Sequence, residues 1–80
     1  MSDKNEFRTK DFYLACYALT QGAKITYLDR VDPRRAVFVF ENVESGESLV
    51  RDFLYRKALV DPQDFVEKIK VLKQLLHSDD

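Results

Sequence analysis

The side chains that most often carry out covalent or metal chemistry are rare in this 80-residue chain. It has one cysteine, Cys16, and one histidine, His77, and the two fall in different predicted helices. A structural zinc site needs four ligands, so this pair predicts no metal centre. Cys16 lies on an apolar helical stripe, where a free cysteine usually packs as a small hydrophobic side chain. His77 lies in the last turn of a predicted helix, where a cation stabilises the helix end.

The carboxylates and glycines do not form the pattern of a catalytic or nucleotide-binding site. The 14 acidic residues are scattered, and no two of them have a reason to meet in a cleft. A phosphate-binding loop of the common kinds needs a glycine-rich segment, whereas the whole chain has two glycines. The sequence therefore predicts that the protein is not an enzyme and that it uses no cofactor and no metal.

Three arginines, Arg30, Arg34 and Arg35, gather around a predicted turn between two strands. Arginine side chains match the geometry of phosphate groups, and a β-ribbon that carries them can enter a nucleic-acid groove. However, Asp29 and Asp32 lie among these arginines, and the net charge of the chain is −1. We therefore interpret the cluster first as a solvated turn with local ion pairs, and phosphate contacts to nucleic acid are the alternative.

Three segments show the apolar spacing and the end signals of helices. The first helix is expected over residues 9–21, with Thr9 as its cap. The second is expected over residues 47–57, because pairs of apolar residues are separated there by polar ones, and a third strand is the alternative. The third helix begins at Asp61-Pro62, a helix cap followed by a proline in the first helical position, and runs to about His77.

A β-hairpin is expected between the first and second helices. Strand-forming residues occupy positions 23–31, a turn follows at Asp32-Pro33-Arg34-Arg35, and a second strand covers residues 36–41. The order is then helix, strand, strand, helix, helix. This is an α+β fold of the type αββαα in a single small domain, with frayed ends at 1–6 and 78–80.

The second strand of this hairpin is apolar on both faces. Val37 and Val39 point to one side of it, and Phe38 and Phe40 point to the other. A strand with one wet face would alternate apolar and polar residues, so both faces of this strand need cover. The phenylalanine face is expected against the first and third helices. The valine face, with Leu28 of the neighbouring strand beside it, requires either the second helix or a second copy of the chain.

A second copy would also satisfy the open edges of the hairpin, because an unpaired strand edge is a template for another strand. Two hairpins paired edge to edge would form a four-stranded sheet across a homodimer. On the first helix, Tyr13 and Tyr17 are neighbours one turn apart, and either later elements or a partner must cover them. The candidate protein interface is therefore Tyr13, Tyr17, Val37 and Val39.

The composition places the chain in a broad class. One cysteine rules out an internal disulfide, and no apolar run approaches the length of a membrane-spanning helix. Because the chain also lacks a signal-peptide pattern, its expected location is the reducing cytoplasm. The 45% hydrophobic content is enough for a packed core, so the chain is not of the disordered class.

Four segments carry a likeness to a known family. They are the stretch from Phe7 to Tyr17, the helix stop at Gly22, the hairpin sequence from Asp32 to Glu41, and the helix start Val60-Asp61-Pro62. Together they resemble a small prokaryotic and phage domain family of unknown function. These motifs are structural, so the resemblance implies the element order and transfers no catalytic residue.

Two functions are consistent with these patterns. The leading hypothesis is a non-enzymatic protein-interaction module that forms a homodimer or binds another protein. The alternative is a nucleic-acid-binding accessory or regulatory protein that uses Arg30, Arg34 and Arg35 as its contacts. No membrane partner and no metal are expected.

Overall fold

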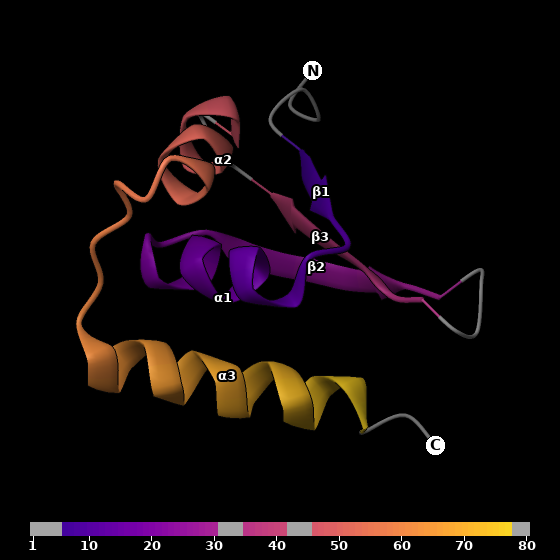
Figure 1. The fold of residues 1–80 in the computed structure, drawn as a ribbon. Helices are drawn as coiled ribbons and strands as arrows, with labels where there is room; N and C mark the ends of the chain where they lie inside the picture. The colour runs from indigo at the N-terminus through magenta and orange to yellow at the C-terminus, as the bar shows by residue number, and fades with distance from the viewer. Residues whose placement is uncertain (1–5, 31–34, 42–45, 78–80) are drawn as a thin grey trace.

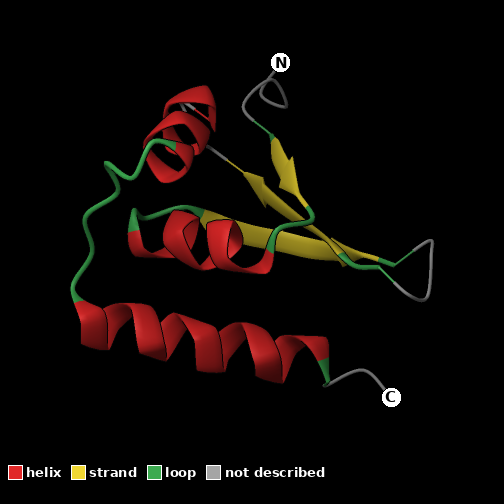
Figure 2. Ribbon diagram, viewed as in Figure 1, coloured by secondary structure: helices red, strands yellow, loops and turns green. Residues whose placement is uncertain are grey.

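The structure, a computed structural model, describes residues 6–30, 35–41 and 46–77. In this part of the chain the order of elements is strand, helix, strand, strand, helix, helix (Figures 1 and 2). The elements are β1 Phe7–Thr9, α1 Phe12–Thr20, β2 Lys24–Asp29, β3 Val37–Glu41, α2 Gly46–Leu54 and α3 Pro62–Leu76. The α+β class is confirmed, and β1 is an addition to the expected order. The expected frayed ends and the expected turn at 32–35 lie outside the described residues, apart from Glu6 and Arg35.

The first expected helix is confirmed, but its start is corrected. Thr9 is the last residue of β1, and α1 begins at Phe12. The helix cap is Asp11, whose Oδ1 accepts hydrogen bonds from the backbone N–H groups of Tyr13 at 3.0 Å and Leu14 at 3.1 Å. Thr9 Oγ1 instead accepts from the Asp11 N–H at 3.1 Å, within the turn that leads from strand to helix. Both side chains satisfy backbone donors, and Asp11 satisfies the ones that belong to the helix.

The second and third expected helices are also confirmed. The segment expected at 47–57 is helical from Gly46 to Leu54, so the alternative of a third strand there is wrong. α3 begins as expected, with Asp61 Oδ2 accepting from the Asp64 N–H at 3.1 Å and a proline in the first turn. A proline removes no hydrogen bond at that position, because the first N–H groups of a helix have no partner inside it.

β1 makes β3 the central strand of the sheet. The strand order is β1-β3-β2, and both pairs are antiparallel. In the first pair, Phe7 lies opposite Phe40 and Thr9 lies opposite Phe38. A central strand has neighbours on both sides, and their side chains flank its own on each face. The hairpin expected from the sequence is therefore two strands of a three-stranded sheet.

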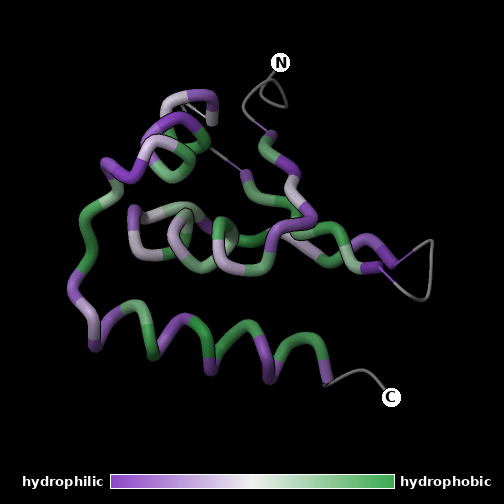
Figure 3. Tube along the Cα trace, in the orientation of Figure 1, coloured by the Kyte–Doolittle hydropathy of each residue, from purple (hydrophilic) through white to green (hydrophobic). Residues whose placement is uncertain are grey.

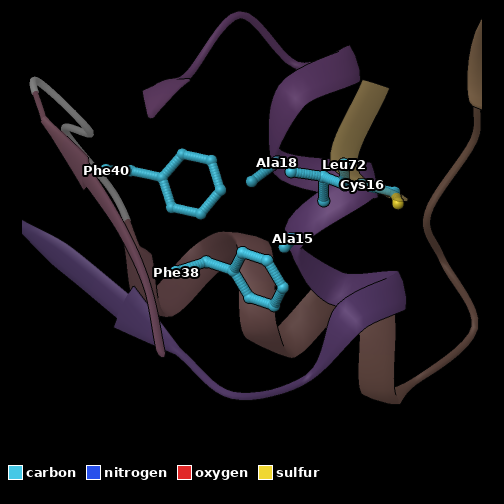
Figure 4. Close-up of a cluster of buried hydrophobic side chains, with 6 residues drawn as sticks. All are labelled: Ala15, Cys16, Ala18, Phe38, Phe40 and Leu72. Carbon is cyan, nitrogen blue, oxygen red and sulfur yellow. The ribbon is translucent and has the colours of Figure 1, made fainter. Parts of the chain in front are cut away.

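The core lies between β3 and the first and third helices. Phe38 and Phe40 point from β3 toward Ala15 and Ala18 of α1, and Leu72 of α3 joins the same cluster (Figure 4). Each of these five residues is at most 2% exposed. The two alanines let the α1 backbone approach the phenyl rings closely, as the density of protein interiors requires. The expectation that the phenylalanine face meets these two helices is confirmed.

α1 is buried on almost all sides. Its buried residues are consecutive: Leu14, Ala15, Cys16, Tyr17 and Ala18. The sheet lies behind α1, α3 lies below it and α2 lies above it in Figure 1, and the Tyr17 ring contacts Phe53 of α2 with ring centroids 6.1 Å apart. A helix that is apolar all round is a core helix, whereas α3 alternates hydrophobic and hydrophilic segments as an outer helix does (Figure 3). In the described part of the chain, no helix combines the length and the apolar character needed to cross a membrane.

A β-bulge in β2 decides which of its side chains reach the core. Thr26 is an extra residue between Ile25 and Tyr27, whose partners on β3 are adjacent. As a result, Ile25 and Leu28 both pack against the core, although they are an odd number of residues apart. Leu28 lies opposite Phe38. The expectation that Leu28 accompanies the valine face is therefore wrong, because one extra residue moves the side chain to the other face of the sheet.

The outer face of the sheet is covered at its centre by side chains of its own edge strands. Val39 has no exposed surface, and its partners across the sheet are Arg8 on β1 and Tyr27 on β2. Directly paired residues point to the same face, so the hydrogen bond of 2.9 Å from Arg8 Nη2 to Tyr27 Oη passes over Val39. Arg8 Nη1 also donates to Asp29 Oδ2 at 3.2 Å, and Asp29 lies opposite Val37. We call Arg8, Tyr27 and Asp29 the Arg8 bridge.

At Val39 the Arg8 bridge takes the place of the second helix, whereas Val37 is only half-buried and its cover by a second copy stays a prediction. The second helix does not cross that face, since α2 packs beside α1 and its first residue, Gly46, lies so close to Phe7 that an added Cβ would come within 2.8 Å of the ring. The Arg8 guanidinium stays partly in water while its apolar stem lies along the sheet. Its hydrogen bond to Asp29 and the nearby Tyr27 raise the pKa of Arg8, so the bridge keeps its charge throughout the physiological range.

Cys16 is a free and fully buried thiol on α1. Burial, with a smaller contribution from the Asp11 carboxylate, raises the pKa of Cys16 from 9.0 to about 11. The thiolate is the reactive form of cysteine, so both its burial and its protonation protect this side chain in the folded protein.

The first prediction concerns the Arg8 bridge. Replacing Arg8 by alanine removes both the cover over Val39 and the link between the two edge strands, so we expect a lower midpoint of urea unfolding. Arg8→Met keeps an apolar stem of similar length and should lose less. Lys10→Ala, in the exposed turn before α1, is the control and should unfold like the wild type. An Arg8→Ala protein with the wild-type midpoint would contradict this description of the outer face.

The second prediction concerns Cys16. We expect the native protein at pH 8 to react with a thiol reagent such as dithionitrobenzoate at least about 100-fold more slowly than the urea-unfolded chain, because even a marginally stable domain opens its core rarely. The rate should rise with urea in parallel with unfolding. Native-state labelling at the rate of the unfolded chain would show that Cys16 is accessible.

Candidate interaction surface

The arginines proposed to contact nucleic acid have different positions in the structure. Arg30 Nη2 donates to the backbone carbonyl of Leu76 at 2.6 Å and to that of Leu75 at 3.4 Å. These carbonyls end α3, where a positive charge stabilises the negative end of the helix dipole. Arg35 is exposed beside the start of β3, and Arg34 lies outside the described residues. Arg30 thus has a structural role that links β2 to α3.

A cavity of about 330 Å³ lies near Arg35. Its described lining is Lys10, Phe12, Arg35, Ala36, Phe38 and Leu76. Two of these side chains are cations and the others are apolar. No carboxylate or imidazole is among the described residues that line it, so they provide no acid–base pair for catalysis.

The four residues proposed as a protein interface divide into two groups. Tyr13 is 55% exposed and Val37 is half-buried, so both offer surface to a partner. Tyr17 is 5% exposed and Val39 is fully buried within the chain, so neither does. Burial raises the pKa of the Tyr17 hydroxyl, and the nearby carboxylate of Asp52 makes a smaller contribution in the same direction. The hydroxyl therefore stays protonated.

A different apolar surface occurs where α2 ends and the chain crosses to α3. Leu54 is 65% exposed, Tyr55 is 66% exposed and Leu59 is 85% exposed. We call these three residues the α2-end patch. In Figure 3 the connection between the two helices carries a hydrophobic stretch along the outside of the fold. Single exposed apolar residues are common on protein surfaces, but several large ones close together in the chain indicate a contact surface.

The backbone at the end of α2 holds this patch in a defined turn. The Lys57 N–H donates to the carbonyl of Asp52 at 2.8 Å, and the Arg56 N–H donates to that of Phe53 at 3.4 Å. These two bonds form a Schellman motif, which requires a left-handed residue after the helix. That residue is Arg56, with φ of 63°. Glycine is the usual choice, and an arginine in this conformation is strained by about 1–2 kcal/mol.

Cations accompany the α2-end patch. Arg51 lies three and four positions before Leu54 and Tyr55, so the three share one face of the helix. The helical geometry continues to Tyr55, whose N–H donates to the Arg51 carbonyl at 2.9 Å. Arg56 and Lys57 follow directly, and all three cations are exposed. The acidic residue of this segment, Asp52, is half-buried, so the exposed charges between residues 51 and 60 are all positive.

Sequence reasoning missed this surface because residue type does not separate it from the core. Leu54 belongs to the same apolar pattern as Leu49 and Phe53. However, Leu49 packs against the core and Phe53 contacts Tyr17, whereas Leu54 is exposed. The signal that was available is the run Ala58-Leu59-Val60. Apolar residues in a connection without helix or strand pattern have no element of their own on which to pack.

The residues first considered for chemistry are not brought together. Cys16 is buried in the core, whereas His77 is exposed after the last turn of α3. They therefore do not form a nucleophile and base pair. Within residues 6–30, 35–41 and 46–77, no group of three or more histidine, cysteine, aspartate or glutamate side chains is placed to hold a metal ion.

Comparison with known proteins places the chain in a family without adding a function. No curated protein and no solved structure matches it. One family model, described as "Domain of unknown function (DUF5659)", matches residues 4–78. This match covers nearly the whole chain and confirms the resemblance to a small domain family of unknown function. The chain therefore belongs to the DUF5659 family.

Proposed function

We propose that this protein is a small, non-enzymatic protein-interaction module of the cytoplasm. The observation that supports the proposal is the α2-end patch, whose three large side chains are each at least 65% exposed. Full burial of such a side chain in a contact is worth about 1.5–3 kcal/mol. Tyrosine is also enriched at protein interfaces, because it offers a large contact area with a polar end.

A binding role agrees with the chemistry of the described residues better than a catalytic one. The thiol of Cys16 is buried and has a pKa of about 11, so it is a poor nucleophile at neutral pH. The cavity beside Arg35 supplies charge and apolar surface but no proton donor and acceptor pair among its described residues. A free thiol also agrees with a reducing compartment.

Self-association through the sheet is the second part of the proposal. The edge strands are β1 and β2, so two copies joined edge to edge would extend a three-stranded sheet rather than a hairpin. β2 is the longer edge, and in a centred antiparallel pair Lys24 of one copy would lie opposite Asp29 of the other. The bulge at Thr26 interrupts this edge, as bulges do in natural edge strands. We therefore expect the dimer to be weak.

The nucleic-acid alternative has less support. Arg30 is engaged at the end of α3, and Arg34 lies outside the described residues. Arg35, the other described member of the cluster, is exposed beside the start of β3. Contact with nucleic acid stays a prediction from the sequence, and we do not propose it as the function.

The third prediction concerns the dimer. Sedimentation equilibrium from low micromolar to submillimolar concentration should show a 9.4 kDa monomer that converts toward twice this mass as the concentration rises. Thr26→Lys adds a charge to the β2 edge and should abolish the larger species, whereas Thr26→Val should retain it. A 9.4 kDa species at every concentration would contradict self-association. It would not bear on the proposal that the α2-end patch binds another protein.

The fourth prediction concerns the α2-end patch. We expect the double variant Leu54→Ser/Leu59→Ser to lose proteins that the immobilised wild type retains from an extract of its own cells, because the contact area is lost. Val71→Ser is the matched control, since Val71 is 50% exposed on α3 and lies outside the patch. Identical retention by the double variant and the wild type would contradict the proposed function.

A further inference from the structure

We infer that the α2-end patch binds an acidic, amphipathic segment of another protein, with Arg51, Arg56 and Lys57 contacting its carboxylates. This inference rests on the proposed function and adds the chemistry of the partner. Leu54, Tyr55 and Leu59 would meet the apolar side chains of that segment. Arg51 precedes Leu54 and Tyr55 in the chain, and Arg56 and Lys57 lie between Tyr55 and Leu59, so exposed cations and exposed apolar residues alternate along this segment.

Charge complementarity selects an acidic partner. All exposed charges between residues 51 and 60 are positive, although the chain as a whole has a net charge of −1. The local sign is therefore opposite to the overall sign. Opposite charges across an interface steer association and disfavour wrong partners, so this surface favours carboxylates and repels basic segments.

A second copy of the chain is a poorer occupant of this surface. In a symmetric dimer the same patch meets itself, so Arg51, Arg56 and Lys57 would face the same three cations of the other copy. Placing like charges opposite one another costs several kcal/mol. Self-association is therefore assigned to the sheet edge, and the α2-end patch is left for a different protein.

The strained backbone of Arg56 supports a role for its side chain in binding. A glycine would satisfy the Schellman motif without strain, yet the chain places an exposed arginine there with φ of 63°. Among the described residues, Arg56 has no ion pair or side-chain hydrogen bond that would explain its presence. Strained residues persist where the conformation serves function, and here it presents a cation beside Leu54 and Tyr55.

The inference is tested by titrating the isotopically labelled full chain with two synthetic peptides and following its amide resonances by NMR. Both peptides carry the same leucine and phenylalanine pattern, and one has glutamate where the other has lysine. We expect the glutamate peptide to shift resonances within residues 51–59 and to bind more weakly as salt increases. The lysine peptide should cause no shift there.

A matched pair of variants separates binding from folding. Arg56→Gly relieves backbone strain, so the variant should fold at least as stably as the wild type, and it should bind the glutamate peptide about two- to fivefold more weakly. Arg35→Ala removes a cation beside the start of β3, outside the α2-end patch, and should leave the affinity unchanged. An unchanged affinity in Arg56→Gly would overturn the role assigned to that side chain.

The other outcomes of this titration are also decisive. Equal binding of both peptides would overturn the acidic partner and leave an apolar docking surface. Shifts centred on Lys10 and Arg35 would place the site at the cavity instead. In a parallel titration with phosphatidylglycerol vesicles, binding to the vesicles without binding to the glutamate peptide would identify an anionic membrane surface and overturn the inference. If neither peptide shifts residues 51–59 while the double variant still loses its retained proteins, the inference fails and the proposed function stands.

Discussion

The burial of both faces of β3 is the constraint on which the rest of this fold depends. An 80-residue chain has a thin core, so each covered apolar side chain matters for its stability. Here the helices cover the phenylalanine face alone. On the valine face, Val39 is covered by Arg8 and Tyr27, which come from the two edge strands and meet over it. The same contact links the strands that flank β3, so it joins the beginning of the chain to its middle.

This arrangement determines where a partner can bind. Because Val39 and Tyr17 are covered within the chain, neither offers apolar surface to another protein. The large apolar side chains with the highest exposed fractions are instead found at the end of α2 and on its connection to α3, where Leu59 is 85% exposed. α2 packs against α1 through Phe53, so its other side faces outward. The fold thus covers Val39 at the centre of the sheet and leaves large apolar side chains exposed at the end of α2, where the proposed function places the partner.

Features that depend on local signals were predictable from the sequence, and features that depend on strand register were not. The Asp61-Pro62 start of α3 and the apolar run of β3 carry their own structural information. β1 is too short to show an alternating pattern, and its identity as a strand comes from pairing with residues far along the chain. The bulge at Thr26 moves every later residue of β2 to the opposite face of the sheet. No residue type in β2 predicts that bulge. The role of Arg8 as the cover of Val39 also depends on strand register, so it becomes visible only when the pairing of all three strands is known.

The most direct test of this account is to identify what contacts the methyl groups of Val39. Isotope-filtered NOE spectra of a mixture of labelled and unlabelled chains separate contacts within one molecule from contacts between two. We expect NOEs from the Val39 methyl groups to the side chains of Arg8 and Tyr27, all within one chain. NOEs from Val39 to side chains of α2, or to a second copy of the chain, would show that the outer face of the sheet is covered in another way and would contradict the account.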